Sequence, residues 1–174
     1  MKKLLLLSII LLGCLNLNSQ EIRKVEVDKF SKKEKIETST EKLFVGLMPF
    51  SLATGSKFEF YISRYGETYR IFANIMLPEM VKYSDGDGID LLLANGDVVS
   101  LLSEYKGLSS KKVGDNRGYV FETVFILSDE DVNLLKQNHV TDIRIRHFDS
   151  YTDKEIKEDK RGLIKTMLNL FNEY

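Results

Sequence analysis

Residues 58–75, FEFYISRYGETYRIFANI, decide the fold that we expect for this chain. Apolar and polar side chains alternate on both sides of Gly66-Glu67, which is the pattern of two half-buried strands joined by a tight turn. Glycine at the first turn position accepts a positive φ, so a two-residue turn sets Tyr61 directly across from Phe72. The apolar face then collects Phe58, Phe60, Ile62, Tyr69, Ile71, Ala73 and Ile75, and the other face collects Glu59, Tyr61, Ser63, Tyr65, Arg70, Phe72 and Asn74.

A second hairpin is predicted around Asn95-Gly96, a strong turn signal between apolar segments. A two-residue turn there predicts the following neighbours on one face: Leu93 with Val98, Leu91 with Ser100 and Ile89 with Leu102, while Asp90 and Leu92 lie on the other. Residues 118–127, GYVFETVFIL, are apolar on both faces except for Glu122 and Thr123. This indicates a central strand that is covered on both sides.

Two helices complete the expected fold. Ser128 and Asp131 have the spacing of a capping box, which predicts a short helix from residue 129. Residues 153–174, DKEIKEDKRGLIKTMLNLFNEY, place apolar residues at helical spacing from Ile156 to Tyr174 and predict an amphipathic C-terminal helix. The fold class is therefore α+β, with residues 43–174 as one domain. Its antiparallel sheet is either sandwich-like or single and curved, with one helix between the last strands and one at the C-terminus.

The N-terminal residues 1–19 are expected to form a secretory signal peptide, because Lys2 and Lys3 precede an apolar run that is too short to span a bilayer. Two processing routes stay open. We favour cleavage after Ser19, which would remove the only cysteine of the chain. The alternative is lipidation of Cys14 in the segment LLGC, which would provide a lipid anchor. Both routes predict an exported protein of the periplasm or cell surface.

Residues 20–42 are highly charged, and they are expected to form either short edge strands or a flexible spacer. Without residues 1–19 the chain has 23 basic and 26 acidic residues. This near balance gives no general attraction to nucleic acid or to an anionic membrane. The rest of the chain has no second apolar segment that could span a membrane.

Three aspartates, Asp85, Asp87 and Asp90, form the only weak candidate for a metal site. Counted from Asp85, an EF-hand would need an acid at position 5 and a glutamate at position 12, where the chain has Ile89 and Gly96. The stretch is better interpreted as a turn that enters a strand, with a calcium-assisted binding module as the alternative.

No other residue pattern indicates a cofactor or a catalytic site. His139 and His147 are expected on different elements without a third zinc ligand. The chain has no nucleophile elbow and no P-loop. A hydrolase that uses two carboxylates and acts on an envelope or extracellular polymer stays open, because its carboxylates are brought together by the fold and not by sequence spacing.

The polar face of the first hairpin is the candidate ligand-binding site, formed by Tyr61, Tyr65, Arg70 and Phe72. Aromatic side chains beside an arginine are typical of recognition surfaces. The alternative is structural, because the C-terminal helix needs a sheet to cover and Tyr61 and Phe72 could form that contact.

The signal peptide, the segment NGDVVSL, the unit LSDEDVNLLKQNHVTDIRIRHF and the C-terminal helix together resemble small uncharacterised exported proteins of Gram-negative bacteria. The resemblance covers most of the region from Ile89 to Phe171. It implies export and an envelope location, and it transfers no activity and no site residue. The sequence thus favours a non-enzymatic exported domain that binds an envelope protein or a surface ligand.

Overall fold

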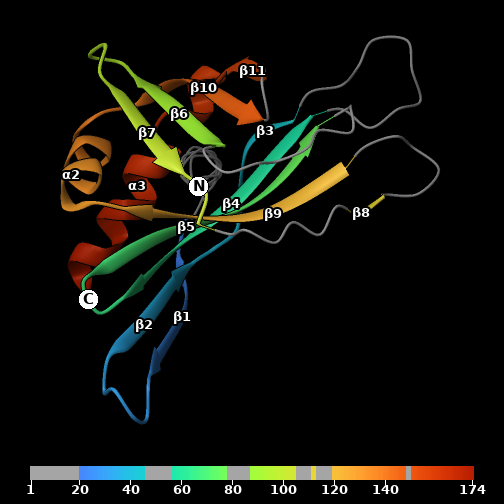
Figure 1. Cartoon of the computed structure of the whole chain (residues 1–174). Helices are drawn as coiled ribbons and strands as arrows, with labels where there is room; N and C mark the ends of the chain where they lie inside the picture. Colours follow the sequence, from blue (N-terminus) through green and yellow to red (C-terminus); the bar gives the residue numbers. More distant parts are fainter. Residues whose placement is uncertain (1–19, 46–55, 78–86, 105–110, 113–118, 148–149) are drawn as a thin grey trace, which may run out of the picture.

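The computed structural model describes residues 20–45, 56–77, 87–104, 111–112, 119–147 and 150–174. The signal peptide, Cys14 and Asp85 lie outside these residues. The described residues form two antiparallel sheets and two helices, so the expected α+β fold is confirmed, with two sheets in place of a single curved one (Figure 1). The first sheet has the order β1-β2-β4-β5-β9-β8 with β3 beside β4, and the second has the order β11-β10-β6-β7.

The hairpin β4–β5 forms the centre of the first sheet. β4 (Lys57–Tyr65) and β5 (Thr68–Leu77) pair in the predicted register, with Tyr61 opposite Phe72. Gly66 has the expected positive φ of 57°. Phe58, Phe60 and Ile62 are buried on one face, as the alternation predicts.

The charged N-terminal segment forms strands, which is the first of the two alternatives for residues 20–42. β1 (Ile22–Val27) pairs with β2 (Glu34–Thr38), and β2 and β3 (Glu41–Val45) share one edge of β4. Between them the Thr38 hydroxyl accepts a hydrogen bond from the Ile62 amide at 3.0 Å. That bond takes the place of a backbone hydrogen bond between strands, at the point where the chain passes from β2 to β3.

β9 (Tyr119–Leu127) pairs with β5 over its whole length and has the two-residue β8 (Lys111–Lys112) on its other side. The prediction of a strand covered on both sides was wrong. Phe121 and Phe125 are buried, whereas Val124 and Ile126 are only half-buried and Glu122 is exposed. β9 is therefore apolar on two faces, but the core covers only one of them.

The second sheet begins with the hairpin of β6 (Gly88–Leu93) and β7 (Val98–Leu102), whose predicted register was wrong by one residue. Leu92 lies opposite Val98, and Leu91 lies opposite Val99. The loop has three residues, since the Leu93 amide donates to the Asp97 carbonyl at 2.9 Å and Gly96 takes φ 94°. This loop places Val99 and Leu101 in the core, where the predicted register would have placed Ser100.

The first helix, α2 (Asp129–Gln137), begins at the predicted capping box. The Asp131 amide donates to Ser128 Oγ at 3.1 Å, and the Ser128 amide donates to the Asp131 carboxylate at 2.9 Å. α2 leads into β10 (Val140–His147), which pairs with β6.

The C-terminal helix is shorter than predicted. Residues Ser150–Glu155 form the strand β11, which pairs with β10, and Glu158–Lys160 form a single 3₁₀ turn, η1. α3 spans only Leu163–Leu170 and continues into the 3₁₀ turn η2 (Phe171–Glu173). β11 was missed because its side chains are mostly exposed and its polar residues fit a helical pattern equally well.

One core lies between the sheets and the two helices (Figure 1). Its largest fully buried side chains include Phe58, Phe60, Phe121, Phe125 and Phe171. Among the described residues, no helix is long and apolar enough to cross a membrane.

Candidate binding face

Tyr61 and Phe72 lie on the face of the first sheet that points away from the core. Their rings stack in parallel, with centroids 4.8 Å apart and planes 1° apart. Both side chains are half-buried. Val124 of β9 lies on the other side of Phe72 in the same row, so the row Tyr61–Phe72–Val124 crosses three strands.

The C-terminal helix packs on the opposite face of the first sheet. Phe171, which follows α3, makes an edge-to-face contact with Tyr69 at 5.4 Å. Its carbonyl accepts a hydrogen bond from Arg64 Nη1 at 3.1 Å. Arg64 and Tyr69 are cross-strand partners on the face that buries Ile62. The alternative in which this helix covers Tyr61 and Phe72 is therefore not what the structure shows.

Of the other two predicted site residues, only Arg70 lies beside the aromatic pair. Arg70 lies in the neighbouring row of the same face, between Ser63 and Ile126. Tyr65 lies near the end of the hairpin, where its hydroxyl and Ser31 Oγ are 2.6 Å apart. The structure thus groups Tyr61, Arg70 and Phe72, while Tyr65 belongs to the contact with the β1–β2 loop.

Sequence reasoning missed the apolar residues that complete this face. They are contributed by β5 and β9, they are half-buried, and they are Met76, Val120, Val124 and Ile126. Together with Tyr61, Arg70 and Phe72 they form what we call the outer patch. The sequence does show that β9 is apolar on two faces. The pattern alone does not reveal whether the second face is covered by the protein or left at the surface.

Ion pairs border the outer patch. Lys35 and Glu37 of β2 are 2.6 Å apart, and Lys57 and Glu59 of β4 are also 2.6 Å apart. The hydrogen bond to Glu37 raises the pKa of Lys35. Partial burial raises the pKa of the Tyr61 hydroxyl, and the Glu37 carboxylate adds to this effect. Between the row of Phe72 and the row of Met76, Glu59, Asn74 and Glu122 form a polar row on the same face. The outer patch therefore combines aromatic and aliphatic groups with charged ones, as protein recognition surfaces do.

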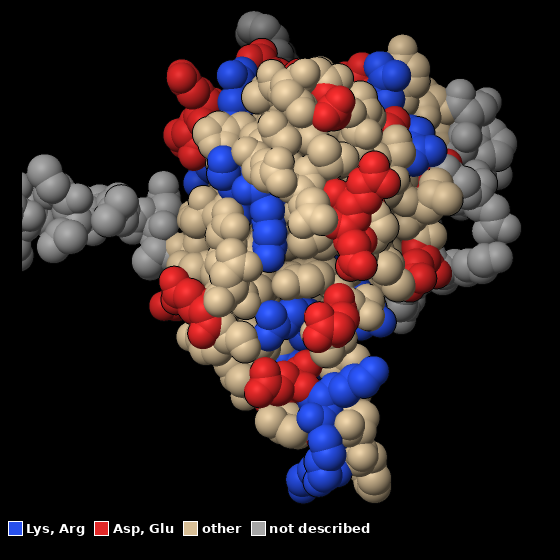
Figure 2. All heavy atoms as spheres, turned by 90° about the vertical axis from the view of Figure 1, so that its left-hand side faces the viewer, with Lys and Arg blue, Asp and Glu red and all other residues tan. Residues whose placement is uncertain are grey.

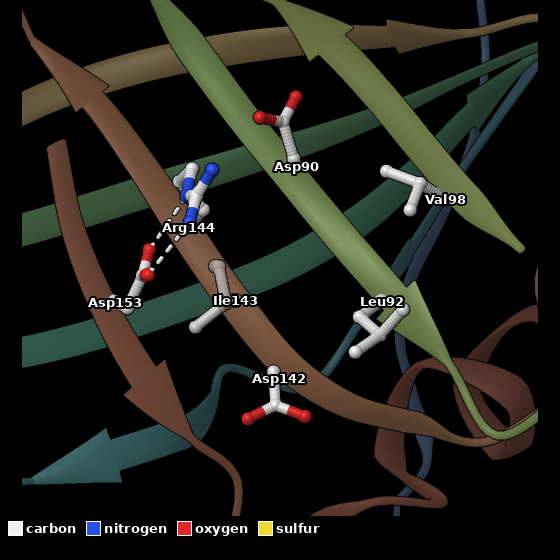
Figure 3. Close-up of a pocket in the computed structure, with 7 residues that line it drawn as sticks. All are labelled: Asp90, Leu92, Val98, Asp142, Ile143, Arg144 and Asp153. Atoms are coloured by element: carbon white, nitrogen blue, oxygen red, sulfur yellow. Dashed lines mark hydrogen bonds and ion pairs between the residues drawn. The ribbon is translucent and has the colours of Figure 1, made fainter. Parts of the chain in front are cut away.

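A separate shallow depression of about 350 Å³ lies on the exposed side of the second sheet (Figure 3). Its lining residues are Asp90, Leu92, Val98, Asp142, Ile143, Arg144 and Asp153. Arg144 donates two hydrogen bonds to Asp153, at 2.7 and 2.8 Å, and lies 4.1 Å from the ring centroid of Tyr151.

The carboxylates of this depression are arranged poorly for acid–base catalysis. The two bonds from Arg144 lower the pKa of Asp153, so this residue stays ionised and cannot serve as a general acid near neutral pH. Asp90 is paired with Arg146 at 3.2 Å. Figure 3 shows the carboxylates of Asp90 and Asp142 pointing away from each other. A hydrolase needs carboxylates that converge on one bond.

The aspartates considered for calcium lie in different surroundings. Asp87 is buried at the start of β6, and Asp90 contacts Arg146. Within the described ranges no three metal-ligating side chains come together. His147 Nε2 lies 3.0 Å from the Thr152 hydroxyl, whereas His139 is exposed after α2.

Comparison with known proteins gives no match: no family model, no curated protein and no solved structure is significantly similar to this chain.

Proposed function

We propose that the protein is a non-enzymatic exported domain that binds a component of the cell envelope through the outer patch. The main support for this proposal is the position of the stacked pair Tyr61 and Phe72. The pair lies on one face of the first sheet, and the C-terminal helix packs on the other. A polar residue would be the ordinary choice at such a position of a half-exposed sheet. An apolar row across three strands is instead suited to contact with a partner.

The composition of the patch supports binding by a flat surface. Aromatic rings supply a large apolar area, and Arg70 supplies a charged fork for carboxylates or carbonyl groups. The ion pairs of Lys35 with Glu37 and of Lys57 with Glu59 border this area. The sequence of residues 1–19 supports export, and it makes an envelope protein or surface ligand the favoured partner class.

Site-specific photocrosslinking in the bacterial envelope tests the proposal. A photoreactive benzoylphenylalanine at Tyr61 or Val124 should capture the same envelope component. A matched probe at Ser100, which is exposed on the second sheet, should not capture it. Changing Phe72 to serine in the Tyr61 probe should abolish the product. Equal capture from all three positions, or capture from Ser100 alone, would contradict the proposal.

A further inference from the structure

The loop between β1 and β2, residues 28–33, carries an aromatic side chain in open water. Phe30 is 97% exposed, more than any other large apolar side chain of the described residues. The loop projects from one end of the first sheet (Figure 1). A phenylalanine in this position gains free energy from any apolar environment that it can enter.

The loop is ordered, so the exposure of Phe30 does not arise from a frayed end. The Asp28 carboxylate accepts hydrogen bonds from the amides of Phe30 and Ser31, at 3.0 and 2.6 Å. These bonds lower the pKa of Asp28, with the Ser31 amide as the largest cause. Lys32 adopts φ 59°, and Ser31 also contacts the Tyr65 hydroxyl at 2.6 Å. The backbone is therefore fixed with the ring directed outward.

Three lysines lie within three residues of Phe30 in the sequence of the loop. Lys29, Lys32 and Lys33 are all exposed in the same loop, and Figure 2 shows basic side chains gathered at this end of the molecule. The carboxylate of Asp28 accepts hydrogen bonds from the loop amides of Phe30 and Ser31. The loop therefore presents an aromatic ring and several ammonium groups to whatever it meets.

We propose that this loop docks onto an anionic lipid surface. Phe30 enters the boundary between headgroups and acyl chains, and the three lysines contact lipid phosphates. A protein partner fits less well, because a stable interface buries about 800 Å² on each side, and a six-residue loop is too small to supply that area. One inserted ring with a few lysines gives the weak, reversible attachment that suffices at a membrane. The proposal does not depend on the outer patch.

The absence of tryptophan from the chain allows a probe at the loop itself. In a Phe30→Trp variant the emission should shift to the blue and be quenched by brominated lipid in vesicles that contain phosphatidylglycerol. Vesicles of pure phosphatidylcholine should produce a much smaller change. A Val98→Trp variant is the matched control, because Val98 is 54% exposed on the second sheet and should give no shift with either lipid.

The lysine charges and the aromatic ring of residue 30 are expected to contribute separately to vesicle binding. Replacing Lys29, Lys32 and Lys33 with glutamine in the Phe30→Trp chain should lower the partition coefficient about tenfold or more. In the wild-type background, Phe30→Ser should lower vesicle binding by a similar factor. The proposal is overturned if the emission of the Phe30→Trp variant stays unshifted with anionic vesicles, shifts equally with both lipids, or shifts only when envelope proteins are added.

Discussion

Gly88 occupies a position where the neighbouring strand leaves no room for a side chain. A Cβ there would overlap the carbonyl oxygen of Leu101 and would lie 3.0 Å from Arg146 Nη2. We expect Gly88→Ala to lower the free energy of unfolding by about 1–3 kcal/mol in urea denaturation, as overpacking of a tight site does. Gly162→Ala is the matched control, because its Cβ would meet only His139 at 3.7 Å. A stability loss of similar size in both variants would contradict this explanation.

The pair of Arg144 and Asp153 predicts a defined pH dependence. The bonds from Arg144 lower the pKa of Asp153 below its ordinary value of 3.8. The stabilisation is therefore complete above the unfolded pKa and is lost as the pH falls through the lower native pKa. We expect wild type to exceed Asp153→Asn in stability at neutral pH by a small amount, because the pair is exposed. Denaturation across a pH series should show this difference shrinking below about pH 4.

The control for this prediction is the same substitution in an Arg144→Met background. Without the guanidinium, Asp153→Asn should leave no difference that depends on pH in that range. A difference that persists unchanged without Arg144 would assign the effect to another partner of Asp153.

The register of β6 and β7 can be tested with cysteine pairs. The structure sets Leu92 directly opposite Val98, at a spacing that a disulfide spans. In a Cys14→Ser background, Leu92→Cys with Val98→Cys should oxidise readily, so that few free thiols react with a maleimide reagent after mild oxidation. The pair Leu93→Cys with Val98→Cys, which fits a two-residue turn, should not. Preferential oxidation of the second pair would show that the register predicted from the sequence is the correct one.

These elements also show what local sequence could predict and what it could not. The β4–β5 hairpin and the Ser128 capping box depend on residues close in sequence, so their geometry was predicted. The β6–β7 turn has two solutions that differ by one residue, and burial of Val99 selects between them. β11 is stabilised by pairing with β10, and its own side chains carry little apolar signal.

At the scale of the whole molecule, the candidate site was predicted only in part. Tyr61 and Phe72 were expected to lie together because one hairpin contains both. The contribution of Val124 and Ile126 requires β9 to pair with β5, about fifty residues earlier in the chain, and local patterns do not specify such a partner. The face that the helices cover is likewise decided by packing and not by the helix sequence.

Comparing Phe72→Ala with Phe60→Ala in urea denaturation tests whether the face that carries Tyr61 and Phe72 lies outside the core. Phe60 is 1% exposed, and it lies on the opposite face of the same hairpin. We expect Phe60→Ala to cost about 3–5 kcal/mol of stability, as for a core aromatic. Phe72→Ala should cost only about 1–2 kcal/mol, from partial burial and the stack on Tyr61. Equal losses in the two variants would instead place Phe72 in a core.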